Sequence, residues 1–121
     1  MKAGDIVLIR FPQADLVDGK LRPALILAVA PGNHPDLLLS LITSRDYQAV
    51  PQFDDIIDSS EDDFEMSGLK TRSFVRLARL TTVESSIISA RLGSISPKRL
   101  QAIKNRLIKW LQESPSKESE G

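Results

Sequence analysis

The stretch KLRPALIL, residues 20–27, decides how the fold begins. Its branched apolar side chains after Pro23 are typical of a buried β-strand. A proline disfavours helical angles at the residue before it and cannot donate a hydrogen bond to a sheet, so it belongs at a strand start, an edge or a bulge. Arg22 is therefore expected to be held in an extended conformation at the mouth of the strand, beside a loop.

Short apolar runs of the same kind recur along the chain, and each is bounded by turn residues. They predict strands over residues 5–11, 21–30, 36–44 and 73–83, and a further strand within 86–96 that ends at Gly93. Segments rich in proline, aspartate and glycine predict the loops that join the first three strands, at residues 12–20 and 31–35. Short strands separated by turns are typical of a small barrel, so the sequence predicts a mainly β domain.

The middle of the chain, residues 45–70, carries a weaker pattern. Residues 50–58 favour a short strand at most, and residues 59–68 favour a loop or a single helical turn. Every charged residue from 54 to 65 is acidic. This acidic block lacks the glycine that a calcium-binding EF-hand loop needs at its turn, so we expect a solvated loop rather than a calcium site.

The end of the domain shows the pattern of an amphipathic helix. Ser96 is a suitable N-cap, and Pro97 fits the first helical position, where no backbone N–H is needed. Apolar residues then recur at spacings of three and four along one face: Leu100, Ile103, Leu107, Trp110 and Leu111. The opposite face is basic, and we expect it to be solvated rather than to form a binding surface; it carries Lys98, Arg99, Lys104, Arg106 and Lys109.

Length and composition limit the class of protein. A chain of 121 residues is about one domain. We place this domain at residues 1–112 and expect an acidic, disordered tail at 113–121, which has no apolar residue. The absence of cysteine excludes disulfide frameworks and thiolate metal sites. No apolar run approaches the roughly 18 residues of a membrane span, and the start lacks the features of a signal peptide, so a cytoplasmic protein is expected.

Charge is segregated along a chain whose formal net charge is zero. Lys and Arg dominate residues 66–112, where Glu84 is the sole acid, whereas the acidic block at 54–65 has no base. Such a chain can present a basic face to a polyanion and cover that face with an acidic segment. A basic helix and an acidic loop that are both solvated would give the same pattern, and composition alone leaves the two interpretations open.

Few residues could carry catalysis. His34 is the sole histidine and sits in a turn, and the chain has neither a cysteine nor a glycine-rich phosphate loop. This excludes Cys/His pairs, two-histidine metal sites and the common nucleotide-binding loops. Arg22 remains, because a guanidinium held by a rigid neighbour can make paired hydrogen bonds to phosphate oxygens. An ion pair with one of the many acids is the alternative role, and the residues alone leave both open.

Several segments, taken in order, resemble the PemK/MazF family of toxin endoribonucleases from bacterial type II toxin–antitoxin systems. They are GDIVLIRFP (4–12), KLRPALIL (20–27), LITSR (41–45), GLKTRSFVRLARLTTVE (68–84) and RLGSISPKRLQAIKNRLIKWL (91–111). The resemblance covers nearly the whole chain, from Gly4 to about Leu111. It implies an SH3-like small β-barrel of the CcdB/PemK type with a C-terminal α-helix packed on it.

The same resemblance implies a function and a site. Members of the family are homodimeric mRNA interferases that cut single-stranded RNA at short sequences without a metal ion or other cofactor, and a cognate antitoxin protein silences them. The arginine of an Arg-Pro step and a hydroxyl residue at the end of the third strand form the family's catalytic pair. These correspond to Arg22 and Thr43, with Ser44 as a candidate helper. RNA-binding residues are expected at Lys20, Lys70, Arg72 and Arg76, the last of them carried over from the family pattern.

One departure from the family pattern limits the mechanism. Some members carry a carboxylate in the strand that reads FVRLARL here, where this chain has Leu77 and Ala78. We therefore expect no assisting acid. An arginine stays protonated near neutral pH, so Arg22 is expected to stabilise charge on the phosphate rather than to act as a general base. Base stacking has few candidates, which are Phe11, Tyr47 and Phe53.

A different class of function stays open at this level. A barrel of this kind can also be a non-enzymatic toxin that poisons a protein target by binding, as the related gyrase poison CcdB does, because fold alone does not fix function. That alternative predicts toxicity that survives the loss of Arg22 and depends on the surface near the C-terminal helix. An inactive member that only binds an antitoxin is a third alternative.

Overall fold

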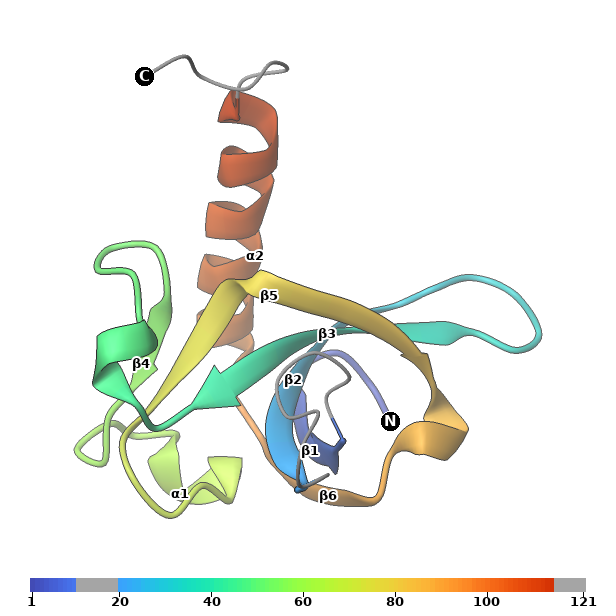
Figure 1. Cartoon of the computed structure of the whole chain (residues 1–121), viewed down its shortest axis with the longest axis horizontal. Coiled ribbons are helices and arrows are strands. Elements are labelled where there is room, and N and C mark those ends of the chain that lie inside the picture. The colour runs from blue at the N-terminus through green and yellow to red at the C-terminus, as the bar shows by residue number, and fades with distance from the viewer. Residues whose placement is uncertain (11–19, 115–121) are drawn as a thin grey trace.

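The computed structural model describes residues 1–10 and 20–114 of the chain. Its strands are β1 (Asp5–Ile9), β2 (Arg22–Val29), β3 (Asp36–Thr43), β4 (Asp55–Ile57), β5 (Ser73–Glu84) and β6 (Ala90–Ser94). The helices are α1 (Phe64–Ser67) and α2 (Pro97–Glu113), and two 3₁₀ turns are η1 (Asp46–Gln48) and η2 (Ser85–Ile87). The predicted mainly β fold with a C-terminal helix is confirmed (Figure 1).

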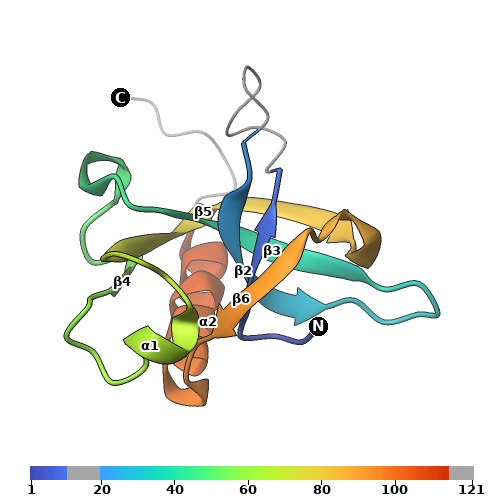
Figure 2. The same ribbon diagram turned by 90° about the horizontal axis from the view of Figure 1, so that it is seen from below.

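The strands form one antiparallel sheet in the order β4-β5-β3-β2-β1-β6. The sheet curls strongly, and the long strand β5 sweeps around it to pair with both β3 and β4 (Figures 1 and 2). The result is a half-barrel, in agreement with the small barrel expected from the sequence. Helix α2 stands against one side of it, and the C-terminal end of the helix projects beyond the strands (Figure 1).

Some element boundaries differ from those predicted. The strand expected within 86–96 begins only at Ala90, because the chain first makes the 3₁₀ turn η2. Helix α2 continues through Glu113, one residue past the expected end of the domain. Phe11, most of the first loop (12–19) and the tail from 115 lie outside the described residues. None of the helices in the described part of the chain is long and apolar enough to cross a membrane.

The pairing of β2 with β3 places the two predicted catalytic residues. Ala24 lies opposite Leu41 in this antiparallel pair. The same register, continued by two residues, sets Arg22 opposite Thr43 at the end of the pair. Residues directly opposite each other in an antiparallel pair project from the same face of the sheet. The fold therefore brings together two side chains that lie far apart in the sequence.

The apolar side chains of β2 alternate between two hydrophobic clusters, one on each side of the sheet. Leu25 and Leu27 belong to the cluster that receives Ile103 and Leu107 of α2. The cluster on the other face holds Val7, Ile9, Ala24, Ile26, Leu37, Leu39 and Leu41. Both faces of the central strands are thus buried, which explains why β2 reads as a continuous apolar run rather than as an alternating one.

Helix α2 begins as the sequence predicts. The Ser96 hydroxyl oxygen accepts a hydrogen bond from the Arg99 N–H at 3.1 Å, and Pro97 occupies the first turn. Trp110 meets Phe53 edge to face, with ring centroids 5.4 Å apart. Leu111 differs from the prediction: it is 61 % exposed, because the last turn of the helix extends beyond the sheet (Figure 1).

The acidic block 54–65 is only in part the solvated loop that its composition predicts, since Glu61, Asp62 and Glu65 are exposed. Asp54, Asp55 and Asp63 are buried. Residues around Asp55 form β4 and pair with β5, which matches the short strand expected there. The single helical turn expected in the polar stretch is α1. A carboxylate can be buried at low cost only beside a cation, so these acids require basic partners.

Arginines of α2 supply those partners. The Arg99 guanidinium donates to Asp63, at 2.8 Å from Nε and 3.0 Å from Nη2, and to Asp55 at 2.7 Å. It also pairs with Glu61, and only 10 % of its side chain is exposed. Arg106 pairs with Asp55 from the next turns of the helix. The expectation that the basic helix face is solvated is therefore wrong at its two arginines, which join α2 to the acidic block.

We predict that Arg99→Ala lowers the free energy of unfolding by about 3 to 5 kcal/mol, because Asp63 would be left buried without its cation. Urea unfolding at neutral pH measures the change. Lys98→Ala is the matched control, since Lys98 is the exposed neighbour on the same turn and its loss should stay within about 0.5 kcal/mol. Equal losses in the two variants would contradict the prediction.

A pH dependence follows from the same contact. The hydrogen bond from Arg99 holds the pKa of Asp63 at about 2, below the usual 3.8. A depressed pKa contributes stability that is complete above the unfolded-state value and is lost as the pH falls through the folded-state value. We expect the unfolding free energy to fall between about pH 4 and pH 2, and to fall less steeply in Asp63→Asn. Urea unfolding across that range tests this, and identical slopes would refute it.

Candidate active site

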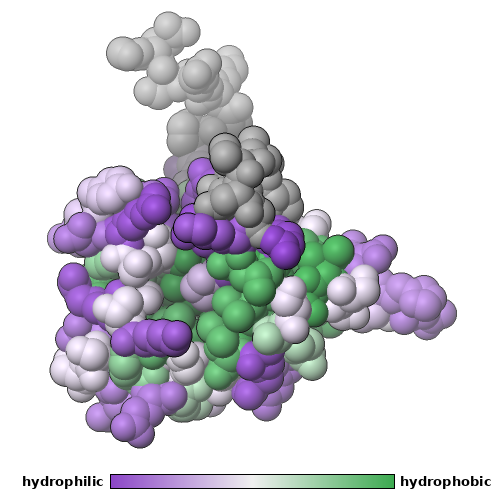
Figure 3. Space-filling view, turned by 60° about the horizontal axis from the view of Figure 1, so that its bottom comes forward, coloured by the Kyte–Doolittle hydropathy of each residue, from purple (hydrophilic) through white to green (hydrophobic). Residues whose placement is uncertain are grey.

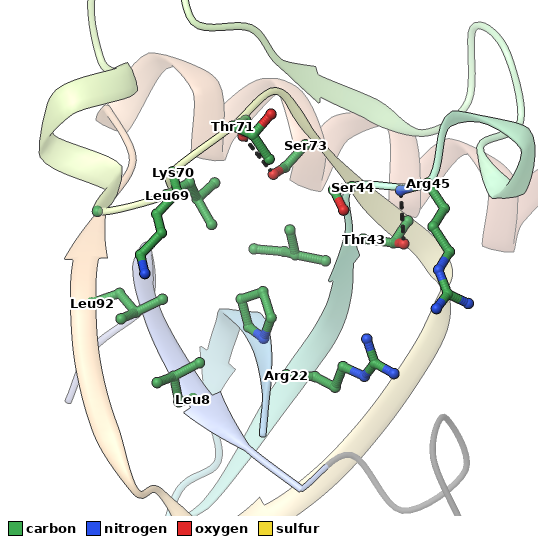
Figure 4. A pocket seen from close by; sticks show the side chains of 13 residues that line it. Leu8, Arg22, Thr43, Ser44, Arg45, Leu69, Lys70, Thr71, Ser73 and Leu92 are labelled. Carbon is green, nitrogen blue, oxygen red and sulfur yellow. Dashed lines mark hydrogen bonds between the residues drawn. The ribbon is translucent and has the colours of Figure 1, made fainter. Parts of the chain in front are cut away.

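A pocket of about 370 Å³ opens between the ends of β2 and β3 and the loop that follows α1 (Figure 4). Four of the residues predicted for the site line it, namely Arg22, Thr43, Ser44 and Lys70. Its apolar wall consists of Leu8, Pro23, Ile42, Leu69 and Leu92. The pocket therefore combines an apolar surface with a few convergent polar groups, as ligand sites usually do.

The polar side chains enter the pocket from separate elements. Arg22 lines the edge of the pocket at the start of β2, and its side chain extends toward the side where Thr43 and Arg45 lie (Figure 4). Pro23 follows it and lies opposite Leu8 of β1. Lys70 enters from the loop after α1, across the pocket from Arg22 (Figure 4). Thr43 and Ser44 come from the end of β3. A group bound in the pocket would thus meet positive charge from two sides and hydroxyls from a third.

The Thr43 hydroxyl is oriented by the backbone that follows it. Its Oγ1 accepts a hydrogen bond from the Arg45 N–H at 3.1 Å. Because a hydroxyl has one proton to donate and that bond uses only its oxygen, the Thr43 proton stays available for an acceptor in the pocket. Thr43 is therefore arranged as a donor to an anionic ligand.

Two close backbone approaches hold the loop of residues 68–73 against β6. Gly68 has a φ of 74°, and a Cβ there would stand 2.2 Å from the Leu92 carbonyl oxygen. A Cβ on Gly93 would stand 2.1 Å from the Met66 carbonyl oxygen. Glycine alone permits both the angle and the contact. The loop is thereby placed so that Leu69, Lys70 and the following residues line the pocket.

A second, smaller hollow of about 50 Å³ adjoins the pocket at the end of β3. The residues that line both spaces are Arg22, Ile42, Thr43 and Arg45, and Leu41 and Gln48 complete the hollow. Sequence reasoning missed Arg45 and Gln48 as site residues. Arg45 is the last residue of the LITSR segment that carries the family resemblance. Its place directly after Thr43 and Ser44 could have indicated a role in the site.

Three of the predicted RNA-binding residues are not among the described residues that line either space. Lys20 is exposed just before β2. Arg72 lies over the Phe74 ring at 4.9 Å and pairs with Asp58 at 3.4 Å. Arg76 is only 18 % exposed, and its Nε lies 3.2 Å from a carboxylate oxygen of the buried Asp54. An RNA contact by Arg76 would have to break this pair.

The aromatic candidates for base stacking occupy different surroundings. Tyr47 lies in η1 between Arg45 and Gln48, and 76 % of it is exposed. Phe53 packs against Trp110, on the side of the molecule where α2 lies, so its ring is already engaged. Of the two candidates that the structure describes, Tyr47 is the one whose position beside the hollow suits stacking on a nucleobase.

The charged residues among the described lining of the site are all basic. No carboxylate occurs among the described residues that line the pocket or the hollow. The buried acids of the block 54–65 face Arg76 and the arginines of α2 instead. The described acids of that block therefore do not line the basic pocket, and the charges of the described lining residues favour an anionic ligand.

Comparison with known proteins identifies the family and the fold of the chain. Residues 2–111 match the model of a family described as PemK-like, MazF-like toxins of type II toxin–antitoxin systems. Among solved structures, a mycobacterial endoribonuclease in complex with its cognate antitoxin is similar, with a TM-score of 0.64 and 16 % sequence identity. The match covers 95 % of this chain and 98 % of that one, so the similarity in fold extends over the whole domain. No curated protein matches the sequence.

We predict that Gly68→Ala destabilises the protein by more than about 1 kcal/mol, because it combines a left-handed backbone angle with a clash against Leu92. Thermal or urea unfolding measures the loss. Gly32→Ala is the matched control, since Gly32 also has a positive φ, of 121°, but nothing lies within 4 Å of its added Cβ. The contact with Leu92 has no energetic role if Gly32→Ala costs as much as Gly68→Ala.

Proposed function

Because the chain belongs to the family of PemK-like, MazF-like toxins of type II toxin–antitoxin systems, we propose that it is an endoribonuclease that cuts single-stranded RNA without a metal ion. One observation carries this proposal. Arg22 and Thr43 lie opposite each other across β2 and β3 and line the same pocket, so a guanidinium and a hydroxyl can meet on one phosphate. The activity to be tested is cleavage of an RNA strand at short specific sequences.

The proposed reaction uses the RNA's own 2′-hydroxyl as the nucleophile. Its oxygen attacks the adjacent phosphorus, and the bond from phosphorus to the 5′-oxygen of the next nucleotide breaks. The 2′-hydroxyl proton leaves to solvent, and the departing 5′-oxygen gains a proton. The products are a 2′,3′-cyclic phosphate and a free 5′-hydroxyl. Such a reaction needs in-line positioning and relief of negative charge on the five-coordinate phosphate.

We assign these tasks to residues of the pocket. Arg22 stabilises the charge through paired hydrogen bonds to the non-bridging oxygens, and it remains protonated throughout. Thr43 donates its hydroxyl proton to the same phosphate, from the orientation that its bond to the Arg45 N–H imposes. Ser44 lines the pocket beside Thr43 and is the candidate helper. The apolar wall excludes water and gives an unstacked base a surface to contact.

Basic residues around the pocket would guide the RNA chain to it. Lys70 is placed to meet the backbone inside the pocket. Lys20 and Arg72 are exposed and would add long-range attraction for phosphates. Arg76 belongs to this proposed set only if RNA displaces it from Asp54, so we expect it to contribute least.

The proposal extends to the partners that the family is expected to have. A cognate antitoxin would neutralise the toxin by placing acidic and apolar side chains on the basic pocket, in the cytoplasm. The expected homodimer is part of the proposal, and the described chain does expose apolar side chains, among them Leu21, Val29 and Ile87. Figure 3 shows one face whose centre is apolar and whose rim is hydrophilic, an arrangement common at protein interfaces.

The decisive experiment incubates the purified protein with a long RNA in EDTA. We expect cleavage to proceed, and Arg22→Ala to slow it by about a hundredfold, the usual effect of losing one donor to a developing charge. Thr43→Val keeps the shape of the side chain and removes the hydroxyl, so it should also slow cleavage. The rate constant under single-turnover conditions is the measurement. Lys109→Ala removes a charge from α2, away from the pocket, and should cleave like the wild type.

Two controls separate the proposal from its rivals. An RNA with 2′-O-methyl groups must resist cleavage if the 2′-hydroxyl is the nucleophile. Intact RNA with the wild-type protein, or equal cutting by Arg22→Ala, would overturn the proposal. Growth arrest in cells that survives Arg22→Ala would instead indicate a toxin that acts by binding a protein target.

A further inference from the structure

We propose that Arg45 is a further catalytic residue, which binds the scissile phosphate together with Arg22 in the small hollow at the end of β3. This inference rests on the proposed endoribonuclease function and adds a second guanidinium to the reacting group. It also divides the site into two parts. The hollow receives the phosphate, and the larger pocket beside it receives the attached nucleoside.

The hollow is much smaller than the pocket that it adjoins. A space of about 10 to 15 Å³ is the least that holds one water molecule. The hollow measures about 50 Å³, which is above that minimum and suits a small polar group such as a phosphate. The neighbouring pocket, at about 370 Å³, has the size for larger groups. Arg22, Thr43 and Arg45 stand at the border of the two spaces, because they line both.

The lining of the hollow is suited to an anion. Its polar members are the guanidiniums of Arg22 and Arg45, the Thr43 hydroxyl and the Gln48 amide, and no carboxylate occurs among its described lining residues. Each of these polar groups can donate a hydrogen bond to oxygen. Two guanidiniums beside one small space make the local potential positive, which favours a phosphate over a neutral group.

The backbone holds Arg45 in place from both sides. Its N–H donates to the Thr43 hydroxyl oxygen at 3.1 Å, and its carbonyl oxygen accepts from the Gln48 N–H at 3.1 Å. Arg45 is the N-cap of η1 and has extended angles, φ −87° and ψ 103°. All three residues of this short chain of hydrogen bonds line the hollow. Arg45 is thereby fixed relative to the hydroxyl with which it would act.

The charge that develops in the reaction gives Arg45 a role in the rate rather than in binding alone. The five-coordinate phosphate carries more negative charge than the phosphodiester from which it forms. A second guanidinium on its non-bridging oxygens is therefore worth more in the transition state than in the ground state, and such an interaction raises kcat. A residue that merely attracts RNA would bind both states equally and change the affinity only.

Single-turnover cleavage in EDTA tests the proposal. We expect Arg45→Ala to lower the rate constant by about a hundredfold, with a much smaller change in the Kd for a non-cleavable 2′-deoxy oligonucleotide of the same sequence. Arg45→Lys should recover part of the rate, because it restores the charge but not the paired hydrogen bonds. Lys109→Ala is again the charge-matched control, and urea unfolding of each variant shows that the loss of rate is not a loss of fold.

A titration with inorganic phosphate separates this inference from the proposed function. In the wild-type protein we expect phosphate to shift the NMR signals of the Thr43 and Arg45 amides, and we expect Arg45→Ala to weaken that binding. A protein that binds phosphate in this way but leaves RNA intact would refute the endoribonuclease while keeping the anion site. Unshifted Thr43 and Arg45 signals, or a cleavage rate of Arg45→Ala equal to the wild type, would overturn the role of Arg45.

Discussion

The pairing of β2 with β3 is the contact on which the rest of the structure depends. These strands occupy the centre of the sheet, and their side chains fill hydrophobic clusters on both of its faces. A slip of one residue would exchange the two sets of side chains between faces, so the core strongly specifies the register. The same register sets Arg22 opposite Thr43. The relative backbone positions of Arg22 and Thr43 in the candidate site are therefore set by the packing of the core.

Separation of charge within the molecule explains how a chain with no net charge can present a basic site. The described acids that are buried in the block 54–65 are bound by arginines, above all by Arg99 and Arg106 of α2. Among the described residues, none of these acids lines the pocket or the adjoining hollow. The basic residues Arg22, Arg45 and Lys70 line the pocket. Net charge was thus a poor guide to the ligand, because opposite charges cancel in the sum while they act in different places.

Local patterns could predict much of the fold but only part of the site. The Ser96 cap, the Pro97 start and the apolar strands depend on neighbours in the sequence, and they agree with the structure. The burial of Asp63 could not be predicted, because its partner Arg99 lies 36 residues further along the chain. Resemblance to a family suggested Arg22 and Thr43. It did not suggest Arg45, whose place depends on how η1 folds back beside β3.

The ion pairs between the acidic block and α2 also bear on how the protein folds during its synthesis. Asp63 lies one turn before the loop that closes the pocket, and it accepts hydrogen bonds from Arg99 and from the Ser96 N–H, at 3.1 Å for the latter. Chains are synthesised from the N-terminus, so the strands that carry Arg22 and Thr43 exist before β6 and α2, which together hold this loop. The pocket wall gains its full support only when β6 and the last helix have been added. A translation product that stops before them would contain Arg22 and Thr43 without a finished pocket, so the proposed activity would require the chain through α2.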